Sequence, residues 1–343
     1  MKIALAILSR NESVLHIRSS LRALGHEVRM LSLDPFEMSC SYIEKKCDEL
    51  GLHGRRRRFD TARFAAYIET LSVWRPERML FVNLPDSVFP YEEMCRIREA
   101  AQAVCCSLCV WMVDVCTRSE ALLDFCGLFD TVASYERADA AWLSSHGVPA
   151  RFVPVGYADV YGQQTFSQEK EQDILFIGTP YRSRLHLLET LAKDVRKYAE
   201  GGLLVIGPFW ERRYPWKKFL FRLRYPTLYR CVENRAVPPE EAARYYTVSR
   251  ICLNLHRTDA NGCNPRTYEI LASGGFELVD ARGDYDILIP DQDLVVFENV
   301  EAMVEKIRYY LAHETERLTI ANSGQSKVRE VRSMREMLRM VLC

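Results

Sequence analysis

A polar loop and the helix after it combine residue types that suit a nucleotide. The stretch 251–280 has the pattern of a buried strand, a polar loop, a helix, a double-glycine turn and a second strand. Asn264 and Pro265 are typical of a helix start, as N-cap and first-turn residues. Arg266 and Glu269, three positions apart, share a face near that start, where anions are also stabilised. A guanidinium suits diphosphate oxygens, and a carboxylate suits the diol of a ribose.

The turn after this helix adds a pair of glycines. Gly274 and Gly275 allow the chain to approach closely as the next strand begins. A simpler alternative remains open for the whole segment. Oppositely charged residues three apart often form an ion pair on a solvated helix, and the glycines would then serve only the turn.

Two more strands of this half are expected to end in glycine. The first, at 173–177, leads into a short loop with two arginines at the start of a helix. The second, at 203–206, is followed by a glycine and the aromatic pair Phe209–Trp210, which could stack on a base. Such loops present backbone N–H groups and guanidinium groups to a phosphate, and the ends of parallel strands converge at one sheet edge. The candidate binding residues in these loops are Gly178, Tyr181, Arg182, Arg184 and Gly207.

Both halves of the chain alternate short apolar runs with helical stretches, which predicts parallel sheets covered by helices. The fold class is therefore α/β, with two doubly wound Rossmann-like domains whose strand ends form the site. The first strand-to-helix turn, at 8–12, has no glycine, so the G-x-G-x-x-G fingerprint of a dinucleotide site is absent there. The expected divisions are a domain at 1–155, a linker at 156–172, a domain at 173–322 and one apolar-striped helix at 323–343. We expect this last helix to pack back on the first domain.

Composition excludes several classes of protein. The 343 residues include 46 Lys and Arg against 46 Asp and Glu, which argues against a nucleic-acid binder with a broad basic surface. No apolar run approaches the roughly 20 residues of a membrane-spanning helix, and the first residues do not resemble a signal peptide. We therefore expect a cytoplasmic protein. Its twelve cysteines lack a second paired C-x2-C spacing and are expected to be reduced, structural thiols.

Several longer motifs of the second half together match one known family. They are Phe176–Arg184, Leu253–His256, Arg266–Gly275, Glu305–His313 and Arg317–Gly324. Thinner matches in the first half are Val110–Asp114, Phe129–Val132 and Gly147–Pro154. On these motifs the second half resembles the donor-binding domain of the spore-maturation CgeB-like glycosyltransferases, a family with the two-domain GT-B fold.

The resemblance implies a hexosyltransferase-like enzyme that moves a sugar from a nucleotide-diphospho-sugar to an acceptor. That acceptor, a protein, a glycan or a small molecule, is not identified by the sequence. By resemblance, Gly178, Arg184 and Arg266 face the diphosphate, Glu269 holds the ribose, and Asn254 and His256 end a strand beneath the donor. The resemblance also implies no tightly bound metal, and Asp284-Tyr285-Asp286, with the letters of a D-x-D motif, is expected in a surface turn.

One position departs from the family pattern. Many retaining members carry a glutamate eight positions before the ribose-binding glutamate, and here that position is Asn261. Glu277 has an E-x7-E spacing with Glu269 but falls inside the next expected strand, so we treat the match as accidental. The stereochemical course is therefore open. Two alternatives to transfer also remain, a sugar-nucleotide epimerase of the GT-B type and a non-catalytic sugar-nucleotide-binding protein.

The catalytic base of an inverting reaction is expected in the first half. Asp114 directly follows the apolar run 110–113, at the strand edge where active residues gather. An N-cap role in the next helix is the rival interpretation. Asp86 and His16 are weaker candidates, and His256 is the candidate of the second half.

Two basic clusters have no assigned role in this scheme. One is the run Arg55–Arg58. The other, 209–230, interleaves seven basic residues with aromatic and aliphatic ones and has a single acid, Glu211. Such a stretch could lie on an anionic membrane surface or bind an acidic acceptor, and a solvated helix is the default. The sequence gives no oligomeric state.

Overall fold

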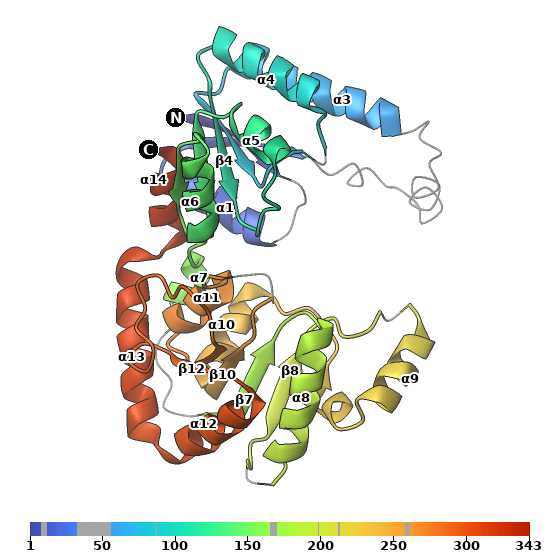
Figure 1. The fold of residues 1–343 in the computed structure, drawn as a ribbon, viewed down its shortest axis with the longest axis vertical. Helices are drawn as coiled ribbons and strands as arrows, with labels where there is room; N and C mark the ends of the chain where they lie inside the picture. The colour runs from blue at the N-terminus through green and yellow to red at the C-terminus, as the bar shows by residue number, and fades with distance from the viewer. Residues whose placement is uncertain are drawn as a thin grey trace. The chain divides into compact units, whose positions relative to one another are not determined.

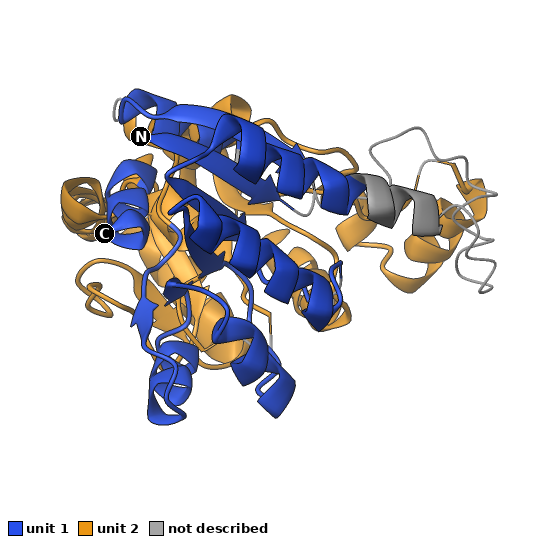
Figure 2. Cartoon of the chain, turned by 90° about the horizontal axis from the view of Figure 1, so that it is seen from above, with its two compact units in different colours: residues 1–155, 334–343 blue, residues 156–333 orange. Residues whose placement is uncertain are grey.

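The computed structural model describes residues 1–7, 12–32, 56–86, 88–164, 170–197, 199–211, 213–257 and 261–343. Its contacts divide the chain into two compact units, coloured separately in Figure 2. The first unit is Met1–Val155 together with Met334–Cys343, and the second is Gly156–Ser333.

The first unit is built on a six-stranded sheet in which every neighbouring pair is parallel. Its strands are β1 (Lys2–Ile7), β2 (Glu27–Ser32), β3 (Arg78–Val82), β4 (Ser107–Met112), β5 (Thr131–Ser134) and β6 (Ala150–Phe152), in the order β2-β1-β3-β4-β5-β6. Its helices are α1 (Glu12–Ala23), α3 (Arg56–Glu69), the π-helical η1 (Thr70–Trp74), α4 (Tyr91–Ala103), α5 (Glu120–Cys126), α6 (Arg137–Ser145) and α14 (Met334–Leu342). Alternate strand residues face opposite sides, so α3, α4 and α5 cover one core and α1 and α14 cover the other.

The second unit repeats this architecture. Its sheet comprises β7 (Gln172–Ile177), β8 (Leu203–Ile206), β9 (Val232–Glu233), β10 (Ser249–Asn254), β11 (Glu277–Asp280) and β12 (Val295–Phe297), in the order β12-β11-β10-β7-β8-β9. Its helices are α7 (Asp159–Gly162), α8 (Arg182–Val195), α9 (Pro215–Arg224), the 3-10 helix η2 (Leu228–Cys231), α10 (Pro239–Val248), α11 (Pro265–Ala272), α12 (Val300–Ala312) and α13 (Glu314–Val331), most of them labelled in Figure 1. The predicted α/β class with two Rossmann-like domains is confirmed.

The strand order of the second unit fixes where a ligand can bind. From β7 the chain moves outward to β8 and β9, and it then returns to the other side of β7 to form β10. The loops after β7 and β10 are therefore neighbours that leave the sheet in opposite directions. This point of reversal is where parallel α/β sheets bind ligands.

The C-terminal helix differs from its expected form. Instead of one helix over 323–343, α13 ends at Val331 and α14 begins at Met334. The break is held in place because Asp286 accepts hydrogen bonds from the Arg332 guanidinium, and the carbonyl of Arg332 accepts one from the N–H of Tyr157 at 3.0 Å. The expectation that the last helix packs on the first domain is confirmed, since α14 contacts α1, β4 and β5.

Other expectations concern the thiols, the linker and positions outside the described ranges. The ten cysteines in the described ranges are free thiols, whereas Cys40 and Cys47 lie outside them. The first part of the expected linker forms α7 and packs inside the second unit. The glycine-free turn at 8–12 and the side chains of Arg55–Arg58 fall largely outside the described residues. No described helix is both long enough and apolar enough to cross a membrane.

We expect Leu338→Ala to destabilise the first unit by about 2–5 kcal/mol, because Leu338 is fully buried in α14 and its loss leaves a cavity. Hydrogen exchange of peptides from β1 and β4 should accelerate, and that of β7 peptides should not. Met340→Ala, in the same helix but 43% exposed, is the matched control and should stay within about 0.5 kcal/mol of the wild type. Equal exchange in the two variants would contradict the role of α14 in this core.

Candidate functional site

The backbones after β7 and β8 approach each other closely because both strands are followed by glycine. A Cβ atom on Gly207 would lie 2.1 Å from the carbonyl oxygen of Gly178, which is too short for any allowed contact. The N–H of Gly178 donates to the carbonyl of Ile206 at 2.9 Å. On its other side, a Cβ on Gly178 would lie 3.5 Å from Nη1 of Arg266. Both predicted glycines therefore leave room for backbone and a guanidinium at this edge.

Two arginines from the first turns of α8 and α11 converge on this edge. Arg184 is 6% exposed, and its guanidinium donates to the carbonyl of Thr179 at 3.1 Å and to that of Leu255. The ring of Tyr181 lies 4.7 Å from the guanidinium carbon. Burial, and then the positive charge of Arg266, lower the pKa of Arg184 to about 10. The two guanidinium groups are thus close enough to repel each other.

Both arginines keep donor capacity that the protein does not use. The Nε atoms of Arg184 and Arg266 are buried and have no hydrogen-bond partner. Arg266 is partly buried, and Tyr246 and Tyr161 both lie near enough to act on it electrostatically. Two like charges with unused donors suit an anion with several oxygens.

Glu269 lies one turn further along α11 and is also partly buried. Burial raises the pKa of its carboxyl group, and the charge of Arg266 opposes that shift. Within the described ranges no ion pair joins Glu269 to Arg266, and neither side chain is exposed. The alternative of an ion pair on a solvated helix therefore does not describe this helix.

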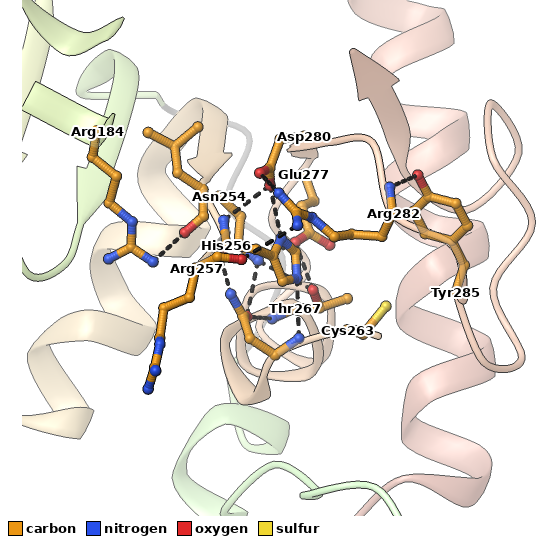
Figure 3. A network of polar contacts seen from close by, with 12 residues as sticks. Arg184, Asn254, His256, Arg257, Cys263, Thr267, Glu277, Asp280, Arg282 and Tyr285 are labelled. Atoms are coloured by element: carbon orange, nitrogen blue, oxygen red, sulfur yellow. Dashed lines mark hydrogen bonds and ion pairs between the residues drawn. The ribbon is translucent and has the colours of Figure 1, made fainter. Parts of the chain in front are cut away.

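Asn254, at the end of β10, is fully buried beneath the start of α11 (Figure 3). Its amide nitrogen donates to Glu277 at 2.7 Å and to Thr267 at 3.1 Å. Its amide oxygen accepts from the side chain of Asn264 at 3.0 Å, and the Asn264 side chain in turn caps α11 through the N–H of Thr267. Asn254 was a predicted donor-binding residue, but its polar atoms are already used to hold α11.

His256 is held in a single neutral form. The backbone N–H of Asn264 donates to its Nε2 at 3.1 Å, so that nitrogen carries no proton. Nδ1 therefore carries the proton and donates to Asp280 at 2.8 Å. Burial lowers the pKa of His256, which favours the same neutral form. With both ring nitrogens occupied, His256 positions α11, and the proton-transfer role predicted for it is not supported by the geometry.

Three other predicted residues of the second unit occupy different places. Gly274 and Gly275 follow the C-terminal end of α11, where a Cβ would meet Gln325 at 2.7 Å or the carbonyl of Tyr246 at 3.1 Å. They pack closely at the opposite end of α11 from Arg266, and their predicted place in the donor site stays a prediction. Arg182, the first residue of α8, is exposed.

Asn261 and Asp286, two other positions discussed in the sequence, both make contacts within the second unit. Asn261 packs against the turn at Gly283, where an added Cβ would lie 2.3 Å from its amide oxygen. Asp286, expected on a surface loop, instead has its carboxylate buried in an ion pair with Arg332. Among the described side chains, no group of three or more His, Cys, Asp or Glu is placed to hold a metal ion.

Tyr246 and Tyr161 are members of the site that sequence reasoning missed. Tyr246 is buried in α10 and Tyr161 is buried in α7. Their rings lie 6.2 Å apart beside Arg266. In the sequence, a single tyrosine at a core-facing helix position does not indicate a binding site, because only the fold places it beside the arginine.

In the first unit, Asp114 lines a cavity of about 550 Å³ at the carboxyl ends of β3 and β4. Asp86 and Cys116 line the same cavity, and the amide of Asn83 donates to the Asp114 carboxylate at 3.3 Å. The N-cap alternative for Asp114 is wrong, because α5 is capped by Ser119. His16 is not among the residues that line this cavity.

The chain is similar in sequence to known glycosyltransferase-like proteins. Residues 182–341 match a family model described as glycosyl transferase-like. This match covers just under half of the chain, most of it in the second unit. The chain is also 24% identical over 223 residues to the spore protein CgeB of Bacillus subtilis (strain 168), a match covering 61% of this chain and 65% of that protein. The predicted resemblance to the CgeB-like family is confirmed.

Solved structures share the fold of the whole chain. A glycosyltransferase from Rickettsia africae ESF-5 matches with a TM-score of 0.72 at 12% identity, covering 99% of this chain and 97% of that one. Sucrose-phosphate synthase from Thermosynechococcus elongatus matches at 0.69 and 16% identity, with the same coverage. Anabaena HepE in complex with UDP-glucose matches at 0.67 and 11% identity, covering 100% and 98%. The predicted GT-B fold is confirmed.

We expect Glu277→Gln to change how stability depends on pH. Burial raises the pKa of Glu277 to about 7, although hydrogen bonds from Asn254 and Thr267 act in the opposite direction. The folded protein then holds a proton that the unfolded chain has released, so the free energy of unfolding falls as pH rises from about 4 to about 7. The glutamine variant lacks this loss. Its stability relative to the wild type should increase across that window by on the order of 2 kcal/mol.

Urea unfolding at several pH values measures this effect. Glu298→Gln, which changes an exposed glutamate just after β12, is the matched control and should follow the wild type. A Glu277→Gln curve parallel to that of the control would show that Glu277 is ionised throughout.

Proposed function

We propose that this chain is a glycosyltransferase that binds a nucleotide-diphospho-sugar in its second unit and transfers the sugar to an acceptor not yet identified. The observation that carries the proposal is the pair of neighbouring, partly unsatisfied guanidinium groups of Arg184 and Arg266 at the sheet reversal point. A diphosphate brings the negative charge and the several acceptor oxygens that this pair lacks.

The proposed donor lies across the ends of β7 and β10. Its diphosphate contacts Arg184, Arg266 and the backbone at Gly178, near the N-terminal turns of two helices whose dipoles also favour an anion. Glu269, one turn along α11, accepts hydrogen bonds from the ribose hydroxyls. This arrangement agrees with the family resemblance, and HepE, which shares the fold, has been solved with UDP-glucose and with UDP.

The same arginines would promote the reaction as well as binding. When the bond between the anomeric carbon and the β-phosphate oxygen breaks, negative charge grows on that oxygen. Fixed guanidinium groups in a partly buried site stabilise this charge without reorganising. The diphosphate therefore leaves more readily here than in water.

We propose Asp114 of the first unit as the base that accepts the proton of the attacking hydroxyl. Its carboxylate is exposed in a cavity large enough for part of an acceptor, and the amide of Asn83 orients it. Asn261 stands where many retaining relatives carry a glutamate, so a displacement assisted by one base suits these residues best.

We expect Arg266→Met to weaken nucleoside diphosphate binding about 10- to 100-fold, because charge-assisted hydrogen bonds to the diphosphate are lost. Calorimetric titration of UDP, GDP and ADP measures the loss and identifies the preferred base. Arg230→Met, which removes an exposed arginine of η2 in the same unit, is the matched control and should bind as the wild type does. Equal affinity in the two variants would place the diphosphate elsewhere.

We expect Asp114→Asn to lower the turnover of the bound nucleotide-sugar by roughly 100-fold or more, because the general base is removed. Hydrolysis of the donor, with water as the acceptor, provides the measurement before the natural acceptor is known. Donor affinity should not change, since the proposed contacts to the donor are Arg184, Arg266 and Glu269, and the variant leaves all three in place. Asp86→Asn alters the second carboxylate of the same cavity and should have the smaller effect. The reverse order would assign the base to Asp86.

A further inference from the structure

Helix α9 exposes an apolar stripe to solvent. Trp216, Phe219, Leu220 and Leu223 are each between 53% and 64% exposed. They stand at positions i, i+3, i+4 and i+7, so they lie along one face of the helix. Burying large apolar groups is favourable, and a set of four on one short helix marks a surface that contacts something else.

The opposite face of α9 holds the helix on the second unit. Phe221 is buried, and its ring contacts those of Phe209, Trp210 and Tyr225 at centroid distances of 5.8, 5.2 and 5.3 Å. The basic segment 209–230 therefore has two parts, an aromatic cluster that packs on the second unit and an apolar stripe that faces solvent. Figure 1 shows α9 at the side of this unit, beyond α8.

Positive charges flank the stripe on both sides. At about 100° per residue, Lys217 and Arg224 lie along one edge of the stripe, and Arg222 lies along the other. Lys217 pairs with Glu211, the single acid between residues 209 and 230. The long side chains of lysine and arginine can extend their charges past an apolar contact toward anions beside it.

We propose that α9 docks the protein on an anionic lipid surface. The apolar stripe enters the boundary between headgroups and acyl chains, and the flanking cations contact lipid phosphates. A second copy of the chain fits less well, because the symmetric contact of two such helices would bring their cations together. A flat anionic surface matches cations on both edges of the stripe at once.

The test uses the full chain and vesicles of phosphatidylcholine, alone or mixed with phosphatidylglycerol. Flotation should occur with the mixed vesicles and should weaken as salt rises, because the cations are screened. The double variant Phe219→Asp/Leu223→Asp should reduce the partition coefficient by at least about tenfold. Arg222→Ala/Arg224→Ala, which removes one exposed cation from each edge of the stripe, should reduce it by a similar factor, since each cation contributes about fivefold.

Val73→Asp is the matched control, because Val73 is 74% exposed on the first unit and outside any such stripe. It should float as the wild type does. Absence of flotation, or equal flotation of the stripe variants and the wild type, would overturn the proposal. Analytical sedimentation tests the alternative that the stripe binds a second copy of the chain. A wild-type dimer that becomes a monomer in the stripe variants, with no lipid binding, would identify the stripe as a self-association surface. Nucleotide titration of the stripe variants should match the wild type, so failure here leaves the donor site untouched.

Discussion

The first turn of α11 is held by hydrogen bonds from buried side chains, and the proposed nucleotide contacts of the second unit depend on where that turn lies. Asn254 fixes the side chain of Asn264, and His256 fixes its backbone N–H. Asp280, from the neighbouring strand, orients His256. Because every member is buried or nearly so, loss of one partner leaves another unsatisfied. Arg266 and Glu269 are therefore presented by a rigid support.

This support also holds Arg266 near Arg184, and the proximity of the two positive charges favours binding of an anion. Bringing like charges together in a partly buried place is unfavourable. Burial is the main cause of the lowered pKa of Arg184, and the positive charge of Arg266 adds to it. An anion between them removes the repulsion and satisfies their free Nε donors at the same time. A doubly charged ligand therefore suits the proposed site better than a neutral sugar, which would neither reduce the repulsion nor supply acceptors of comparable charge.

The sequence predicted the parts of this site that depend on local spacing. Arg266 and Glu269 follow from the N-cap and proline before them, and the two glycine-ended strands follow from their apolar runs. Asn254 and His256 were assigned to the ligand, yet their partners Glu277 and Asp280 come from β11, and only the parallel pairing of β10 with β11 brings them together. The turn at Arg332 was missed for the same reason, because Asp286 is 46 residues away.

The return of α14 to the first unit affects the order in which the protein can fold. The core of Trp111 and Leu5 is completed by Met337, Leu338 and Val341, which the ribosome adds only after the whole second unit. During synthesis this face of the first sheet is therefore covered only by α1 until α14 is made, while the second unit, which is continuous in sequence, can fold at once. The first unit is therefore the first to be synthesised and the last to complete its hydrophobic core.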